Sequence, residues 1–263
     1  MVSIKSEIIR KEKFMFDISY INERGGRVVN EDSILVEDME EKIFISIADG
    51  LGAHGGGDLA SKVAIDVARK EYARIKKIDQ KNIYRIFEVI NEAIVAQQTE
   101  ELKMKTTLSC VLCRNKYIYS AHLGDTRVYF FKDNRLRFMT KDHSVAYEEI
   151  TKNHGSLEDI RKDPKRHILK AALGVGKIRQ PDIFKQKIKN DAAVLICSDG
   201  FWEYVNENEM IETLTDTITA REWLGAMMKY HSEKADMFND NYSAICLRIT
   251  KNKGGKTLWN TKV

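Results

Sequence analysis

Acidic residues stand where apolar segments of this sequence begin or end. The run Ile43–Ala48 is rich in β-branched residues and reads as a buried strand, and Asp49 follows it directly. Taken singly, an Asp-Gly pair such as the one at 49–50 is typical of a turn. The pattern recurs, however, and acids at the same end of neighbouring strands would gather in one place. The aspartates in such positions are Asp49, Asp125, Asp199 and Asp240.

A cluster of unpaired carboxylates repels itself unless a cation occupies its centre. Oxygen ligands with no cysteine or paired histidine beside them favour Mg²⁺ or Mn²⁺ over zinc. Two such ions can share a carboxylate and activate a water for attack on phosphorus. Arg27, close in sequence to Glu31 and Asp32, offers a guanidinium fork that suits phosphate oxygens. These residue types therefore indicate phosphoryl chemistry at a metal pair.

The glycine-rich segment DGLGAHGGGDLAS, at 49–61, offers the alternative of a phosphate-cradling loop. A nucleotide-binding P-loop ends in Gly-Lys-Ser or Gly-Lys-Thr, and this segment contains no lysine. Asp58 also places negative charge where a bound phosphate needs positive charge. We therefore interpret the segment as a metal-binding loop.

Strand-like runs joined by short turns occupy most of the chain. Short connections favour antiparallel pairs, because parallel strands need long crossovers. Two long helical patterns interrupt the series at 58–77 and 79–98, and Asp58 is a good N-cap for the first. Capping boxes at Asn206 and Thr219 open two further helices. We predict an α+β fold, an α-β-β-α sandwich of two antiparallel sheets with roughly ten strands and four main helices.

The apolar stripes of the two long helices follow helical spacing. For the first helix, the expected stripe consists of Leu59, Val63, Val67 and Ala68. For the second helix, it consists of Ile83, Ile86, Phe87, Ile90 and Ile94.

No linker divides the 263 residues, so we expect one catalytic domain over residues 1–250. A charged, weakly periodic segment at about 143–180 predicts a surface flap with short helices. Residues 251–263 predict a basic, disordered tail. The N-terminal segment lacks the apolar stretch of a signal peptide and no apolar run is long enough for a membrane span, which predicts a cytoplasmic protein. The net charge of +4 is spread along the chain and does not favour nucleic-acid binding.

The four cysteines are expected to be core residues. Cys110 and Cys113 form a C-x-x-C sequence, but they lie in a strand-like segment, where positions three apart face opposite sides. Extended chain would also separate their α-carbons by roughly 10 Å, beyond the reach of a disulfide. Cys197 and Cys246 lie in apolar runs. Zinc binding and redox chemistry are therefore not expected.

Seven short motifs occur in a characteristic order. They are RVVNED (27–32), DGLGAHGGGDLAS (49–61), GDTR (124–127), DHS (142–144), ALG (172–174), SDG (198–200) and DNYS (240–243). This ordered set resembles the metal-dependent protein serine/threonine phosphatases of the protein phosphatase 2C type (the PPM family), in their compact bacterial form. The resemblance covers about residues 14–249.

The resemblance implies a centre of two divalent ions, Mg²⁺ or Mn²⁺. Asp49 would bridge the two ions, and the carbonyl of Gly50 would hold one of them. Asp199 and Asp240 would hold the other ion. Bacterial relatives often hold a third, weaker ion, and Asp125 together with Asp199 matches its ligands.

Further roles are implied outside the metal ligands. Arg27 would bind the substrate phosphate, and Glu31 would orient metal-bound water while Asp32 supports the loop. His54 matches the family's candidate general acid, although some relatives carry a histidine directly after Asp-Gly instead. In the flap, Lys-Ala at 170–171 replaces a usual Thr-Arg, which leaves the flap contacts and the substrate choice open.

The implied activity is metal-dependent hydrolysis of phosphoserine and phosphothreonine on proteins by a metal-activated water. The expected partners are phosphorylated proteins and a cognate bacterial Ser/Thr kinase. One alternative is a catalytically weak protein that keeps the fold for binding or sensing, whose signature would be loss of the metal acids. Another is a two-metal nuclease, which would need a basic and aromatic surface along a strand path.

Overall fold

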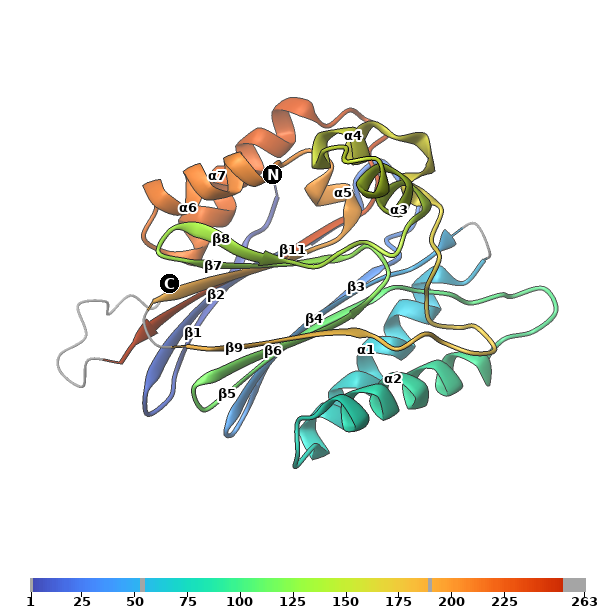
Figure 1. Cartoon of the computed structure of the whole chain (residues 1–263), viewed down its shortest axis with the longest axis horizontal. Coiled ribbons are helices and arrows are strands. Elements are labelled where there is room, and N and C mark those ends of the chain that lie inside the picture. The colour runs from blue at the N-terminus through green and yellow to red at the C-terminus, as the bar shows by residue number, and fades with distance from the viewer. Residues whose placement is uncertain (1, 53–54, 189–190, 253–263) are drawn as a thin grey trace.

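A computed structural model of the chain describes residues 2–52, 55–188 and 191–252. Two antiparallel sheets pack face to face, and helices cover their outer faces (Figure 1). The six-stranded sheet contains, in spatial order, β1 (Lys5–Arg10), β2 (Phe14–Glu23), β11 (Tyr242–Lys251), β10 (Ala192–Cys197), β7 (Arg127–Lys132) and β8 (Arg135–Met139). The five-stranded sheet contains β3 (Asp32–Met39), β4 (Lys42–Asp49), β5 (Leu108–Arg114), β6 (Tyr117–Leu123) and β9 (Asp182–Lys187). The predicted fold class is confirmed.

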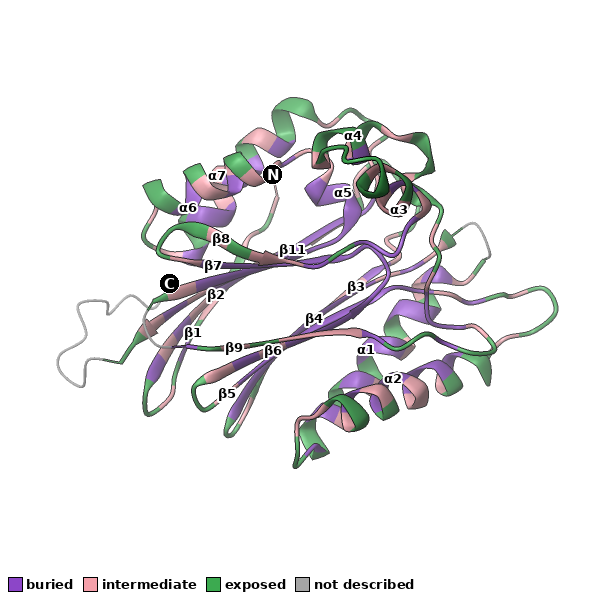
Figure 2. Ribbon diagram, viewed as in Figure 1, coloured by how far each residue is buried: buried purple, intermediate pink, exposed green. Residues whose placement is uncertain are grey.

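The space between the sheets is filled by the inward-facing residues of both. Figure 2 shows buried residues concentrated on the strands and on the helix faces that meet them. Cys113 belongs to the core between the sheets, whereas Cys110 faces the core beneath the helices that cover the five-stranded sheet. The prediction that the C-x-x-C residues face opposite sides is therefore confirmed. All four cysteines, including Cys197 and Cys246, are buried and have free thiols.

Four main helices complete the sandwich. The helices α1 (Gly57–Arg74) and α2 (Gln80–Val95) cover the five-stranded sheet, and α6 (Glu207–Asp216) and α7 (Ala220–Lys234) cover the six-stranded sheet (Figure 1). The capping boxes predicted for α6 and α7 are present, and so is the predicted buried stripe of α2. In the part of the chain that is described, no helix is both long and apolar enough to cross a bilayer.

The start and the buried face of α1 differ from the prediction. The helix begins at Gly57, and its N-cap is Gly56 in the left-handed region (φ 70°) rather than Asp58, which lies in the first turn. Of the predicted stripe, Ala68 is buried and Val63 and Val67 pack against the core, but Leu59 is 45% exposed. The small residues Ala60 and Ala64 are buried in its place. Small side chains let the helix backbone lie close to the sheet. The helical spacing of large apolar residues does not indicate this close contact.

One strand was not predicted. Its sequence is KSEIIR, and Ile9 is its only buried residue, so β1 lacks the apolar alternation that identifies a half-buried strand. It lies at the edge of the six-stranded sheet, where the backbone of β2 supplies its pairing. At the other end of the chain, β11 extends to Lys251, one residue past the predicted domain boundary, and residues 253–263 of the predicted tail lie outside the described residues.

The predicted flap consists of short helices connected by irregular segments. They are α3 (Val145–Lys152), α4 (Leu157–Lys162) and the 3₁₀ turn η2 (Pro164–His167). One isolated bridge pairs Ser144 with Leu169 within the flap, and another pairs Leu173 with Thr106, which attaches this part of the flap to the segment just before β5. The flap lies beside α5 (Asp199–Trp202), a single helical turn that follows β10 directly (Figure 1).

Candidate metal centre

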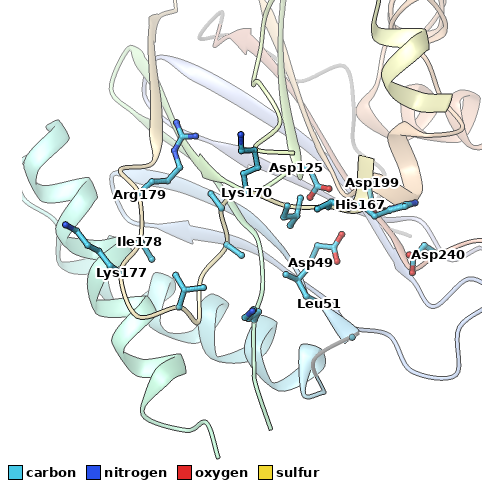
Figure 3. A pocket seen from close by; sticks show the side chains of 18 of the residues that line it. Asp49, Leu51, Asp125, His167, Lys170, Lys177, Ile178, Arg179, Asp199 and Asp240 are labelled. Carbon is cyan, nitrogen blue, oxygen red and sulfur yellow. Dashed lines mark ion pairs between the residues drawn. The ribbon is translucent and has the colours of Figure 1, made fainter. Parts of the chain in front are cut away.

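The four strand-end aspartates line one pocket of about 680 Å³ (Figure 3). Asp49 ends β4, and Asp125 lies in the turn between β6 and β7. Asp199 is the first residue of α5, and Asp240 lies two residues before β11. Arg27 and Gly50 line the same pocket. The structure therefore brings together residues that are as much as 213 positions apart in the chain.

The backbone of Asp49 is fixed by its neighbours in the five-stranded sheet. Its carbonyl accepts hydrogen bonds from the backbone N–H of Thr107 and from the hydroxyl of Thr106, each at 2.8 Å. Its own N–H donates to Oγ1 of Thr107 at 3.0 Å. Since its main-chain groups are satisfied within the sheet, Asp49 presents only its carboxylate to the pocket.

A close packing of two turns places Asp199 near Asp240. A Cβ on Gly200 would lie 2.2 Å from the carbonyl oxygen of Asn241, so glycine alone lets the start of α5 approach the start of β11 this closely. Ser198 strengthens the junction, because its hydroxyl accepts from the N–H of Ser243 at 2.9 Å. The Asp-Gly pair at 199–200 thus reflects backbone proximity, as well as a turn.

Arg27 reaches the pocket from the loop before β3. Its Nη2 lies 2.7 Å from Oδ2 of Asp240, and its side chain is 59% exposed. Gly25 has a left-handed backbone (φ 61°), and a Cβ there would lie 2.2 Å from the carbonyl oxygen of Asp240. The glycine turn therefore holds Arg27 beside the carboxylates while its guanidinium stays open to solvent.

Burial and mutual repulsion act on the carboxylates. They raise the pKa values of Asp49 and Asp125 well above the usual range. Burial likewise raises the pKa of Asp32 to about 7, although the hydroxyls of Ser243 and Ser198 oppose the shift. Removal from water and like charges both disfavour the ionised form, so a bound cation is the natural counter-charge.

Within the described part of the chain, one carboxylate oxygen of Asp32 is hydrogen-bonded and the other is not. Its Oδ2 accepts from the hydroxyl of Ser198 at 2.8 Å. Its Oδ1 is buried and has no hydrogen-bond partner among the described residues. An all-oxygen set of carboxylates, with Gly50 beside Asp49, has the chemistry that Mg²⁺ and Mn²⁺ require, so the residues present fit a centre of such ions.

His167, at the end of η2, was not identified from the sequence. Its Nδ1 lies 3.4 Å from Oδ2 of Asp199, and its Nε2 lies 3.9 Å from Oε1 of Glu203. The hydrogen bond between the two side chains raises the pKa of His167. Burial by itself would raise the pKa of Asp199, but the interaction with His167 outweighs it and lowers that pKa. Arg166 adds a two-pronged pair with Glu203 at 2.6 and 3.1 Å, so the flap is fastened to α5 beside the site.

The sequence signal for His167 is weak for a physical reason. His167 lies in the densely charged run RKDPKRH, where Pro164 opens the short turn but no periodicity marks an inward-facing position. Only the packing of the flap against α5 shows that this histidine, rather than a neighbouring charged residue, meets Asp199.

Glu31 lies behind the glycine loop. A Cβ on Gly52 would lie 2.1 Å from its Oε2, and a Cβ on Gly57 would lie 2.7 Å from its Oε1, so both positions leave room for the carboxylate. The backbone N–H of Glu31 donates to Oδ1 of Asn241 at 2.9 Å, and its carbonyl accepts from Gly50 at 3.2 Å. Glu31 is therefore adjacent to the pocket without lining it. His54, the candidate general acid, lies outside the described residues.

Comparisons with known proteins agree with this geometry. The family model described as "Protein phosphatase 2C" matches residues 23–235. The serine/threonine phosphatase stp of Listeria monocytogenes is 32% identical over 219 residues, which cover 80% of this chain and 82% of that protein.

Solved structures share the fold. A Streptococcus agalactiae serine/threonine phosphatase superimposes with a TM-score of 0.77 at 20% identity and covers 89% of this chain and 99% of its own. The catalytic domain of the phosphatase PstP, in complex with two manganese ions, also has a TM-score of 0.77, at 22% identity, and covers 90% and 99% of the two chains.

Proposed function

Because this chain belongs to the protein phosphatase 2C family, we propose that it hydrolyses phosphoserine and phosphothreonine on proteins with the help of Mg²⁺ or Mn²⁺. The observation that carries the proposal is the convergence of four carboxylates and the guanidinium of Arg27 on a single pocket. A relative that is 32% identical is a serine/threonine phosphatase, and a neighbour in fold binds two manganese ions, which supports the same assignment.

The pocket residues divide naturally into ion ligands and a phosphate ligand. Asp49, the Gly50 carbonyl, Asp199 and Asp240 would hold two ions, and Asp125 with Asp199 would hold a third. When bound, such ions lower the pKa of water and withdraw charge from phosphoryl oxygens. Binding would offset the burial and the repulsion that together raise the pKa of Asp49 in the free protein.

The remaining groups bind and orient the substrate. The guanidinium of Arg27, exposed and held at the pocket by Asp240, would exchange that carboxylate for phosphate oxygens, which its planar fork matches. Glu31, fixed by its backbone to Asn241, would orient the attacking water. His54 would protonate the leaving alkoxide.

Thiol chemistry does not explain the activity. Burial raises the pKa of Cys110 to about 12, and it does the same for Cys113. A thiol that stays protonated in a core is a poor nucleophile. Direct attack by water, without a phosphorylated cysteine, is the step that these residues support.

The expected partners follow from the reaction. The substrates are phosphorylated proteins, and a Ser/Thr kinase that supplies them is the expected counterpart. We also propose that the protein works in the cytoplasm, where four free cysteines would remain reduced.

The test replaces one ligand without changing its size. Asp199→Asn should abolish Mn²⁺-dependent release of phosphate from a phosphothreonine peptide and from p-nitrophenyl phosphate, and EDTA should abolish it in the parent. Asp216→Asn, a matched change at the exposed end of α6, should leave both activities intact. Activity near the parent rate in a correctly folded Asp199→Asn protein would contradict the proposal.

A further inference from the structure

The pocket has a second, cationic end. It continues from the carboxylates along the last part of the flap, and Figure 3 shows Lys170, Lys177 and Arg179 on the side away from Asp199 and Asp240. Ile178, whose side chain is buried, lines the pocket beside Lys177 (Figure 3). Besides Arg27, the cations that line the pocket are Lys105, Lys170, Lys177 and Arg179, and we call these four the basic wall.

The backbone of the basic wall is fixed to the sandwich. Leu173 exchanges backbone hydrogen bonds with Thr106, at 2.8 and 3.3 Å, which brings the wall beside the segment that supports Asp49. The side-chain oxygen of Asn91, on α2, accepts from the N–H groups of Gly174 and Val175 at 2.8 and 3.0 Å. The backbone before Lys177 is thus hydrogen-bonded both to the segment that supports Asp49 and to α2.

Gly174 makes this attachment possible. It has a left-handed backbone (φ 84°), and a Cβ there would lie 2.1 Å from the carbonyl oxygen of Met104. Gln98 donates to the carbonyls of both residues, at 2.7 Å for Met104 and 2.8 Å for Gly174. Close backbone packing therefore fixes the chain at Gly174, three residues before Lys177.

Positive charge on the wall exceeds the negative charge around it. Arg179 pairs with Asp182 at 3.3 Å, and Lys170 pairs with Glu148. Among the residues that the structure describes, Lys170 and Arg179 are the members of the wall that take part in an ion pair, and Lys105 and Lys177 take part in none. Lys177 is exposed and Lys105 half-buried, so their charges are available to a ligand in the pocket.

We propose that the basic wall binds acidic residues that flank the phosphorylated residue of a protein substrate, so that the enzyme prefers phosphorylation sites in acidic stretches. The inference rests on the proposed function, because the phosphate must occupy the carboxylate end through metal ions and Arg27. An anionic side chain elsewhere along the pocket then meets the charges of Lys105 and Lys177, which no acid of the described chain neutralises. Carboxylates and a second phosphorylated residue offer the same chemistry, and the experiment separates them.

The experiment compares phosphothreonine peptides of equal length. One carries Asp and Glu on both sides of the phosphothreonine, one carries Asn and Gln at those positions, and one carries a second phosphoserine in an otherwise neutral sequence. Phosphate release with Mn²⁺ gives kcat/KM for each. Two or three partly exposed ion pairs should favour the acidic peptide over the neutral one by roughly fivefold at low salt. The preference should shrink toward unity near 1 M salt, where the screening length is about 3 Å.

Variants locate the effect. K177Q/R179Q should reduce the ratio of the two kcat/KM values to about twofold or less. The single variant K177Q, at an exposed side chain, keeps the test valid if the double variant is poorly folded. K187Q, at an exposed lysine on β9 that does not line the pocket, is the matched control and should keep the parent ratio.

The outcomes are distinct. Equal rates on all three peptides, or a preference that survives K177Q/R179Q, would overturn the inference while leaving the proposed function intact. Absence of turnover on every peptide and on p-nitrophenyl phosphate would instead contradict the proposed function. A preference for the doubly phosphorylated peptide alone would support the wall and identify phosphate, rather than carboxylate, as its anion.

Discussion

The buried ion pair between Arg127 and Asp142 allows a sharp test of how the site is supported. Arg127 donates from Nε and Nη2 to the two carboxylate oxygens of Asp142 at 2.8 and 2.7 Å, and the side chains are 0% and 1% exposed. The guanidinium also stacks on the ring of Trp202 at 3.6 Å, and the indole N–H of Trp202 donates to the carbonyl of Asp125 at 3.0 Å. The pair therefore stands directly behind one of the pocket carboxylates.

Replacing Asp142 by asparagine leaves the guanidinium buried, and Glu207, 3.5 Å from Nη1, is then its one remaining ion-pair partner among the described residues. Removing one partner of a buried pair costs about 3–5 kcal/mol, because the remaining charge stays desolvated. At about 2–4 °C per kcal/mol for a protein of this size, the melting temperature should fall by roughly 6–20 °C. Urea unfolding followed by circular dichroism, with EDTA present to remove metal effects, measures the loss.

Two further variants test whether desolvation causes the loss. K162Q breaks an exposed pair with Glu158 at 3.0 Å and should change stability by less than about 1 kcal/mol. R127M/D142L removes both buried charges and should recover most of the stability lost in D142N. If D142N loses less than about 1 kcal/mol, or if the double variant is less stable than D142N, the unpaired charge of Arg127 is not the main cause of destabilisation.

Three other predictions follow from the geometry. Arg27→Ala should lower kcat/KM on a phosphothreonine peptide about ten- to hundredfold, since a charged hydrogen bond contributes about 1.5–3 kcal/mol; an unchanged value in steady-state assays would count against phosphate binding by Arg27. Burial and the neighbouring His122 lower the pKa of His143 from 6.5 to about 4. Its neutral form therefore contributes up to about 3 kcal/mol of stability above pH 6.5, and this stability is lost as the pH falls toward 4. In urea titrations, His143→Asn should reduce the dependence of the unfolding free energy on pH in this range. Mn²⁺ at about 100 times its Kd should stabilise the protein by about 2.7 kcal/mol in thermal scans, and Asp49→Asn should remove most of that gain.

The elements that could be predicted are those with a strong local signal. The stripe of α2 follows helical spacing with large apolar side chains, and the capping box at Thr219 marks the start of α7 without reference to any other element. The buried face of α1 could not be predicted in the same way. Its contact with the sheet uses Ala60 and Ala64, whose small side chains carry little hydrophobic signal but permit a close approach.

The candidate site shows the same division. The acids at strand ends and their order along the chain identify the family and the metal ligands that it implies. His167 and Glu203 could not be found in this way. His167 lies more than thirty residues before Asp199, whereas Glu203 directly follows α5, and only the packing of the flap on α5 brings the three side chains together. The basic wall likewise joins Lys105 with Lys177 through the pairing of two irregular segments.

The amino-acid sequence by itself determined that this chain alternates strands with short turns, that aspartates occupy the strand ends, and that their motifs follow the phosphatase order. These properties depend on residue type and short-range spacing, which a linear pattern records. The tertiary structure alone decided that the carboxylates share one pocket, how far burial shifts their pKa values, and that lysines from distant segments face them. Those properties depend on sheet register, on glycine-mediated backbone contact and on the exclusion of water, which arise only when segments far apart in the chain pack together.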